Sequence, residues 1–359
     1  MGIWHRVQPF LFRIGEERAH SLVRCALKYP FFIKKEFKDK ALSVSIAGLN
    51  FSNPLGIAAG FDKNADVPNG ILRLGFGFTE IGTLTPLSQL GNPSPRCFRL
   101  PRDKALINRM GFNNQGYDAA YKRLVVRKKK GILGINIGAN KNSEDRFADY
   151  VRGIESLYEV SDYFTLNVSS PNTQGLRDLQ EIANLRSLLP LVIEARDRQM
   201  QIFNRFVPVF LKISPDLTEK ELDSLAAEIL YSKLDGLVIS NTTISRTDLK
   251  ESFSNEIGGL SGAPLFRQST IILAKMRKRL GKNYPIIGVG GIMDPITALE
   301  KIKAGADLLQ CYTGLIYNGP FMVQEILESF IMTCRRDSIE NITVYRDKNM
   351  QKWASQNIE

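Results

Sequence analysis

The stretch Tyr163–Arg177, YFTLNVSSPNTQGLR, joins a loop that could do chemistry to the strand that would hold it. Its first half is apolar and β-prone, and after Asn167 the chain breaks into serines, a proline and another asparagine. A buried strand that ends in a polar loop fixes the loop and presents its side chains to a ligand. A plain Ser-Pro-Asn turn between two elements is the alternative, so the neighbouring segments must decide.

Polar side chains also follow the other apolar stretches. Asparagines and two lysines, Lys63 and Lys212, stand at these positions, and carboxylates are few. Amides suit a planar heterocycle rich in donors and acceptors, and lysines suit an anionic ligand or a developing negative charge. Since an unpaired lysine is costly to bury, Lys212 is expected to meet an anionic or strongly polar group. A surface lysine whose ammonium reaches water is the alternative.

The elements that would position these residues follow a repeating pattern of a short apolar stretch, a polar or glycine-rich tip and a helical segment. Near-continuous apolar strands that alternate with helices imply a parallel sheet covered on both faces. The eight apolar stretches are 55–60, 78–83, 133–138, 163–169, 206–214, 234–242, 284–291 and 306–314, and the clearest helical patterns are 180–200, 219–232, 265–280, 295–304 and 320–335.

Eight such units predict an α/β fold, the (β/α)₈ TIM barrel. A doubly wound open sheet is the alternative, but it usually carries GxGxxG after its first strand, and LGIAAGFDKN is not that motif. Glycines after the last two strands, in GVGG and YTG, would let backbone N–H groups approach a phosphate. We therefore expect a phosphate-bearing ligand there, although glycine at a barrel rim can also be a simple turn.

The chain divides into three predicted parts. Residues 1–40 form a small N-terminal cap of two amphipathic helices separated near Gly15 and followed by YPFFIKKEFKDK. This cap is either a helical hairpin docked on the main domain or a patch that lies on a membrane, with lysines near lipid phosphates. Residues 41–335 form the barrel, with a β-hairpin first and long inserts at 84–117 and 243–264 on the catalytic face. Residues 336–359 are polar, and we expect a solvated tail.

Composition sets outer limits. A chain of 359 residues with 43% hydrophobic residues can bury a large core. The net charge of +11 suits a polyanion, an anionic membrane surface or an anionic substrate. Four cysteines without CxxC spacing and only two histidines indicate reduced thiols in the cytosol, and no metal site is expected. No apolar run approaches the ~20 residues of a membrane span.

Eight motifs resemble, in order, those of class 2 dihydroorotate dehydrogenases, the quinone-linked and membrane-associated type. They are NPLGIAAGFDKN, EIGTLTP, NRMGFNNQG, GINIGANK, NVSSPNTQGLR, ISNTT, GGLSGAPL and IIGVGGI. The resemblance implies FMN in a (β/α)₈ barrel, oxidation of dihydroorotate to orotate in pyrimidine synthesis, and electron transfer to a membrane quinone. It also implies a peripheral protein on the cytoplasmic face of a bacterial inner membrane, bound to anionic lipid through residues 1–40. We expect no nucleic acid partner.

The same resemblance assigns roles to single residues. Ser170 matches the catalytic base that takes the C5 proton of dihydroorotate, and class 1 relatives have cysteine there. Thr173 and the lid residue Phe112 match a proton relay. His20 and Arg99 match the quinone site. Positions that match FMN binding are Ala59, Gly60, Thr83, Asn136, Asn167, Lys212, Ser240 (often threonine in relatives), Gly262, Gly291, Tyr312 and Thr313. Positions that match substrate binding are Lys63, Asn108, Arg109, Met110, Gly111, Phe112, Asn167, Asn172, Asn241 and Thr242.

Three other functions fit parts of the sequence. A class 1 dihydroorotate dehydrogenase would use a soluble acceptor, but Ser170 and the amphipathic N-terminus argue against it. A flavin-dependent tRNA-modifying reductase would explain the net charge of +11, but it needs a general-acid cysteine, and none stands at a matching loop. A non-catalytic membrane-binding barrel is the third.

Overall fold

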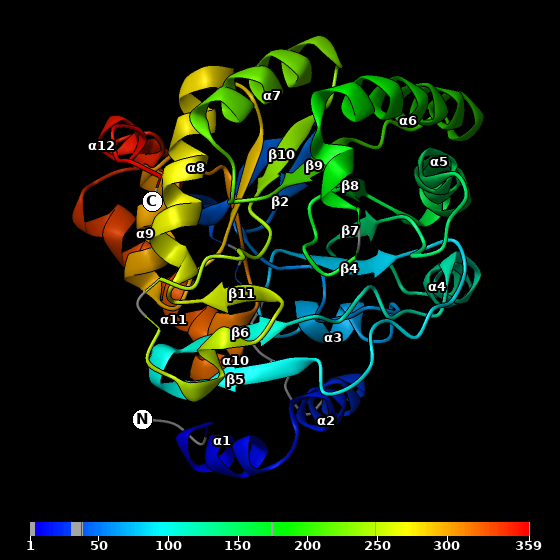
Figure 1. The fold of residues 1–359 in the computed structure, drawn as a ribbon. Helices are drawn as coiled ribbons and strands as arrows, with labels where there is room; N and C mark the ends of the chain where they lie inside the picture. Colours follow the sequence, from blue (N-terminus) through cyan, green and yellow to red (C-terminus); the bar gives the residue numbers. More distant parts are fainter. Residues whose placement is uncertain (1–3, 30–36, 38, 174, 248, 359) are drawn as a thin grey trace.

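The computed structural model describes residues 4–29, 37, 39–173, 175–247 and 249–358 (Figure 1). Its parallel strands close into a barrel in the order β10-β12-β13-β3-β4-β7-β8-β9. The strands are β3 (Leu55–Ile57), β4 (Phe78–Leu84), β7 (Ile132–Ile137), β8 (Tyr163–Asn167), β9 (Val209–Ile213), β10 (Gly236–Ile239), β12 (Ile286–Val289) and β13 (Leu308–Cys311). Each overlaps one predicted apolar stretch, so the predicted (β/α)₈ barrel is confirmed.

Helices connect consecutive strands on the outside of the barrel (Figure 1). Some begin with strong local signals: Thr218 and Glu221 form a capping box at the start of α7, which pairs backbone N–H groups that the helix leaves free. The helices are α3 (Pro68–Leu72), α4 (Tyr117–Val125), α5 (Arg146–Leu157), α6 (Ile182–Phe203), α7 (Glu219–Tyr231), α8 (Leu265–Leu280), α9 (Pro295–Lys303), α10 (Thr313–Asn318) and α11 (Phe321–Arg336).

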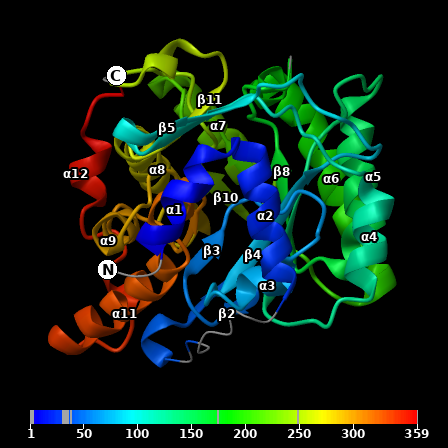
Figure 2. The ribbon, with the colours of Figure 1, turned by 90° about the horizontal axis from the view of Figure 1, so that it is seen from below.

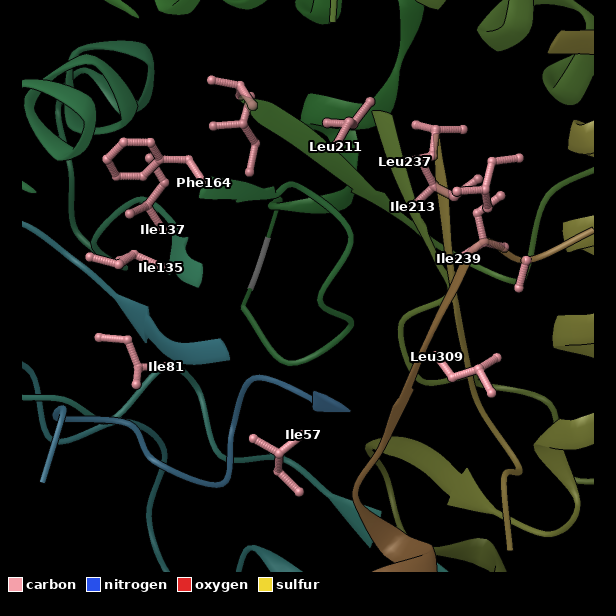
Figure 3. Close-up of a cluster of buried hydrophobic side chains, with 14 of the residues drawn as sticks. Ile57, Ile81, Ile135, Ile137, Phe164, Leu211, Ile213, Leu237, Ile239 and Leu309 are labelled. Carbon is pink, nitrogen blue, oxygen red and sulfur yellow. The ribbon is translucent and has the colours of Figure 1, made fainter. Parts of the chain in front are cut away.

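The barrel strands are apolar because both of their faces are buried. Outward side chains from strands all round the barrel, such as Ile81 and Leu237, belong to the cluster that also includes the helices (Figure 3). Inward side chains, including Phe78, Tyr163 and Phe210, form a second cluster inside the barrel. The predicted hairpin is present as β1 (Val44–Ile46) and β2 (Leu49–Phe51). The Phe51 ring contacts Phe78 at the start of β4, so the hairpin closes the end of the barrel where the strands begin.

The two long inserts pair with each other beside the barrel. Strands β5 (Cys97–Leu100) and β6 (Ala105–Asn108) come from the first insert, and β11 (Gly259–Gly262) comes from the second. They form an antiparallel sheet in the order β11-β6-β5. This sheet lies between the barrel and the N-terminal helices (Figure 1).

Helices α1 (Trp4–Arg13) and α2 (Glu16–Lys28) lie across the other end of the barrel, where the strands terminate (Figure 2). Arg24 forms an ion pair of 2.7 Å with Asp66, which anchors α2 to the barrel. Val7, Phe10 and Leu22 nevertheless remain exposed, with Phe10 at 68%. The pair of helices α1 and α2 is therefore docked on the barrel and also presents exposed apolar side chains. Most of the YPFFIKKEFKDK stretch lies outside the described residues. Within the described ranges, no helix is long and apolar enough to cross a bilayer.

The C-terminal segment differs from the solvated tail that we expected. It forms a 3-10 turn over Ile342–Tyr345 and helix α12 (Met350–Ala354), and it packs beside α8 and α9 (Figure 1). Ile342 is fully buried and Tyr345 is 6% exposed. The expectation was wrong because a few apolar side chains in a polar segment are enough to bury one face.

Candidate functional site

A cavity of about 590 Å³ extends from the C-terminal ends of the barrel strands to α1 and α2. Its barrel end carries polar side chains, and its helix end is lined by apolar ones such as Leu11 and Val23. Most of the predicted site residues line it: His20, Ala59, Gly60, Lys63, Thr83, Arg99, Asn108, Met110, Gly111, Phe112, Asn167, Ser170, Asn172, Lys212, Ser240, Asn241, Thr242, Gly262, Gly291, Tyr312 and Thr313. Asn136 and Arg109 are not among its lining residues.

Ser170 stands in the loop directly after β8 and is 5% exposed. The backbone N–H of Asn172 donates to Ser170 Oγ over 3.3 Å. The loop is held from the first insert, since Asn92 Nδ2 donates to the Asn172 carbonyl over 3.0 Å. Asn172 Nδ2 in turn donates to Asn108 Oδ1 over 3.1 Å. Strand β8 and the insert together place a serine hydroxyl and two amides on one wall of the cavity.

A chain of hydrogen bonds orients the amides on the cavity floor. Asn241 Nδ2 donates to Asn167 Oδ1 over 3.0 Å, and Asn167 Nδ2 donates to Thr83 Oγ1 over 2.9 Å. Thr83 Oγ1 donates to Asn136 Oδ1 over 2.6 Å, and Asn136 Nδ2 donates to Glu80 Oε1 over 2.8 Å. Because Glu80 Oε1 accepts at the end of the chain, every bond in the chain donates toward Glu80. Asn136 therefore orients Thr83 and does not itself line the cavity.

Glu80 is a residue that the sequence analysis missed. It is fully buried on β4, and its second oxygen accepts from Tyr163 Oη, Thr165 Oγ1 and Gln310 Nε2 at 2.9, 3.1 and 2.6 Å. The available signal was a carboxylate in an otherwise apolar strand, which is rarely buried without partners. Gln310 was also missed, and it lines the cavity.

The two lysines, Lys63 and Lys212, line the cavity. Burial lowers the pKa of Lys212, while nearby Glu80 favours its charged form. Burial also lowers the pKa of Lys63, to about 8. Among the described residues, neither ammonium group makes a hydrogen bond or an ion pair. Such a group favours an anionic or electron-rich ligand, because only a partner offsets its desolvation.

Glycines shape the end of the cavity formed by β12, β13 and β11. Gly262, Gly290 and Gly291 have φ values of +99°, +108° and +71°, which other residues rarely adopt. A Cβ at Gly291 would lie 2.3 Å from the Cβ of Phe266, so only glycine fits there. The backbone can thus approach a ligand closely. Ser261, which the sequence analysis also missed, lines this region and shares a 2.8 Å hydrogen bond with Thr313.

Several buried polar atoms around the cavity have no partner within the described part of the chain. They are Asn172 Oδ1, Thr173 Oγ1, Thr242 Oγ1 and Gln310 Oε1. A buried acceptor or hydroxyl without a partner costs about 1–3 kcal/mol. The atoms of the cavity-lining residues Asn172, Thr242 and Gln310 therefore mark positions for ligand hydrogen bonds.

The predicted quinone residues lie where the cavity meets the helices. Burial lowers the pKa of His20 to about 3, so its ring is neutral. His20 Nε2 lies 2.8 Å from the Phe61 carbonyl and must donate, because a carbonyl only accepts. Arg99 donates to the Leu11 carbonyl over 3.0 Å and pairs with Glu16 at 3.3 Å. His20 thus joins α2 to the barrel, and Arg99 joins the helices to the insert sheet.

Arg109 differs from the other predicted substrate residues. Its guanidinium pairs with Glu256 at 2.5 Å and lies 4.6 Å from the Phe98 ring centre. The side chain thus connects the two inserts. Among the described residues, no group of His, Cys, Asp and Glu side chains could hold a metal ion.

Comparisons with known proteins cover nearly the whole chain. The model of the dihydroorotate dehydrogenase family matches residues 41–333. A relative named dihydroorotate dehydrogenase (quinone) from Bartonella tribocorum is 55% identical over 345 residues, which are 96% of both chains. A relative of the same name from Brucella anthropi is 56% identical over 346 residues, 96% of this chain and 95% of its own length.

A solved structure has the same architecture. DHODH from Eimeria tenella in complex with ferulenol superposes with a TM-score of 0.88 at 37% identity, covering 93% of this chain and 96% of its own. Because the family match spans most of the barrel and the relatives match from end to end, the chain belongs to the dihydroorotate dehydrogenase family.

Proposed function

We propose that this protein oxidises dihydroorotate to orotate in pyrimidine synthesis and passes the electrons through FMN to a membrane quinone. The observation that carries the proposal is the end-to-end similarity to enzymes named dihydroorotate dehydrogenase (quinone). Enzymes of this family are in general flavoproteins. The cavity supports the same reaction, because it connects a polar site at the ends of the barrel strands to an apolar region lined by helices α1 and α2.

The residues present fit FMN. The glycines at 262, 290 and 291 would admit a phosphate to backbone N–H groups, and Thr313 would add a hydroxyl. The orphaned Gln310 Oε1 and the Thr83–Asn167 pair offer hydrogen bonds to a planar ring system. When bound, FMN supplies a hydride acceptor for C6 of the substrate and a store of electrons for the quinone. Lys212 would stabilise negative charge at the ring.

The chain's own residues would bind the substrate and move its proton. Lys63 would pair with the carboxylate of dihydroorotate, and Asn108, Asn172 and Asn241 would bind its amide edges. Ser170 would take the proton from C5. A serine hydroxyl is a weak base at neutral pH, so the proton must move on. The buried Thr173 hydroxyl, three residues after Ser170 in the same loop, is the proposed exit.

We also propose that the chain divides at residues 40 and 335 into the cap, the barrel and the C-terminal segment. The cap would bind the quinone beside His20 and Arg99 and lie on anionic lipid at the cytoplasmic face of a bacterial inner membrane. The exposed Val7, Phe10 and Leu22 support this placement.

The absorbance spectrum of the purified protein tests the proposal. We expect a flavin band near ~450 nm that bleaches when dihydroorotate is added without oxygen. Ubiquinone should then restore the band, and fumarate should not. A colourless protein, or a flavin that dihydroorotate does not bleach, would contradict the proposed reaction.

A further inference from the structure

The C-terminal segment, described over residues 336–358, reaches from the β1–β2 hairpin to the proposed phosphate end of the cavity. Near its start, Asn341 Nδ2 donates to the Lys40 and Ser43 carbonyls over 2.8 and 2.9 Å. Farther along, the Asn349 N–H donates to the Lys303 carbonyl over 2.8 Å. Helix α12 then lies against α8 (Figure 1). The segment is thus attached to the barrel at both ends.

Trp353 joins the C-terminal segment to Phe266 of α8. Its ring meets the Phe266 ring edge-on, with centroids 6.0 Å apart and an interplanar angle of 85°. Its Nε1 donates to Glu300 Oε1 over 2.7 Å, and Asn349 Nδ2 donates to the same oxygen over 2.8 Å. Edge-on aromatic pairs contribute about 0.5–1.5 kcal/mol beyond area burial, so Trp353 restrains the Phe266 ring.

Phe266 in turn lies directly against the loop after β12. A Cβ at Gly291 would lie 2.3 Å from the Phe266 Cβ and 2.4 Å from its Cα, so the first turn of α8 touches the glycine backbone. Any outward shift of Phe266 would leave Gly291 without its support.

Phe266 also lies beside a buried lysine. Lys301 is fully buried, and its Nζ lies 5.0 Å from the Phe266 ring centre. Nζ donates to Ser269 and Thr270 hydroxyls at 2.7 and 2.8 Å, and Ser269 Oγ donates to the Gly290 carbonyl over 3.2 Å. Phe266 therefore contacts both the buried lysine of α9 and the C-terminal segment.

We infer that the C-terminal segment is part of the flavin phosphate site, with Trp353 as a positioning residue that holds Phe266 and, through it, the Gly290–Gly291 loop. The inference rests on the proposed binding of the FMN phosphate at this loop. Trp353 does not line the cavity, so its effect would pass through the residues it contacts, Phe266 and Glu300.

The rate of FMN release from the full-length holoprotein, followed by the rise of free-flavin fluorescence after dilution, tests the inference. Trp353→Ala should release FMN about tenfold faster, since it removes the aromatic pair. Trp353→Phe keeps an edge-on ring and should stay within about threefold. Glu300→Ala removes the acceptor shared by Trp353 and Asn349 and should release FMN about threefold faster. Lys352→Ala, at an exposed neighbour, is the matched control and should release FMN at the unmodified rate.

A second control separates positioning from general loosening. Ile154→Ala in α5, on the other side of the barrel, destabilises a chain whose C-terminal segment is intact. The melting temperature of Ile154→Ala should fall at least as far as that of Trp353→Ala. Its rate of FMN release at 25 °C should nevertheless match that of the unmodified protein. Flavin that remains bound to Trp353→Ala should still bleach with dihydroorotate at the unmodified rate.

Three results would overturn the inference. One is FMN release from Trp353→Ala at the rate of Lys352→Ala. Another is equally fast release from Ile154→Ala. If Trp353→Ala yields no soluble protein, release from Glu300→Ala at the Lys352→Ala rate is the third. An unmodified protein that holds no flavin would instead overturn the proposed function and this inference together.

Discussion

At the scale of single residues, the chemistry depends on polar groups whose pKa or orientation is changed by burial. Ser170 is nearly enclosed, Lys63 and Lys212 have lowered pKa values, and the floor amides have fixed orientations. The site thus holds its donors and acceptors in place before a ligand arrives, which is the condition for strong electrostatic stabilisation.

Replacing Ser170 by alanine should abolish most turnover and spare flavin binding. A positioned general base contributes about 10²–10⁴-fold, so we expect a loss of that size in the rate of flavin bleaching by dihydroorotate at pH 7. Anaerobic stopped-flow absorbance measures it. Ser170→Cys should recover part of the rate, because a thiolate can accept the proton. Bleaching of Ser170→Ala at the unmodified rate would remove Ser170 from the role of base.

Lys63 should make substrate binding depend on pH. With its pKa lowered to about 8, the free ammonium is charged below pH 8 and neutral above it, while a substrate carboxylate stays negative. Affinity should therefore fall as pH rises through 8. Loss of a hydrogen bond between charged groups costs about 1.5–3 kcal/mol, or roughly 10- to 100-fold in the dissociation constant of orotate. Flavin difference spectra between pH 6 and 9 would measure this constant.

Lys63→Met supplies the control for that titration. It should bind orotate weakly and with no step near pH 8, because the titrating group is gone. A step that persists in Lys63→Met would assign the pH dependence to a different residue.

At the scale of elements, helices α1 and α2 act as a cap whose inner face lines the cavity and whose outer face is partly apolar. Glu16 pairs with Arg99, and Arg24 pairs with Asp66, so the cap is attached to both the insert sheet and the barrel. An element held by polar contacts at its inner face can offer its apolar side chains to a membrane.

Removing residues 1–30 should separate the two half-reactions. Flavin bleaching by dihydroorotate should continue, because the strand-end residues remain. Reduction of a long-chain quinone and binding to anionic vesicles should fall about tenfold or more, since the apolar entrance is lost. Unchanged long-chain quinone reduction would contradict the role of the cap.

Phe10→Ala provides a milder version of this experiment with the cap in place. Phe10 is 68% exposed, so its replacement should leave folding unchanged. Burying a phenylalanine in lipid contributes about 1.5–3 kcal/mol, and vesicle binding should weaken by roughly tenfold or more. Vesicle co-sedimentation measures the change.

At the scale of the whole molecule, a buried charge network joins the chain's last segment to the barrel. Arg277 and Asp307 are 1% and 3% exposed and pair at 2.7 Å, and Arg346 of the C-terminal segment also pairs with Asp307. Arg277 donates further to the carbonyls of Gly305, Gly281 and Tyr284. These contacts compensate the buried charges and connect α8, β13 and the C-terminus.

Asp307→Ala should destabilise the protein strongly. It leaves the buried Arg277 guanidinium with only the more distant carboxylate of Asp347, at 3.6 Å. Breaking a buried pair typically costs about 3–5 kcal/mol in the free energy of unfolding. Asp223→Ala removes only an exposed partner of Arg279 and should cost less than about 1 kcal/mol. Urea unfolding followed by circular dichroism measures both. Equal midpoints for the two variants would contradict the importance of the network.

The sequence by itself determined the features that depend on local pattern. Apolar stretches and helical periods predicted the barrel strands and two cap helices, because periodicity is a property of neighbouring residues. The break after Asn167 and the GVGG motif located the cavity wall and the glycine end. Tertiary structure alone decided which distant residues meet. It placed Asn136 behind Thr83, directed Arg109 away from the cavity, paired the two inserts in one sheet and packed the polar C-terminal segment. These outcomes depend on contacts between segments far apart in the chain, and composition and spacing do not encode such contacts.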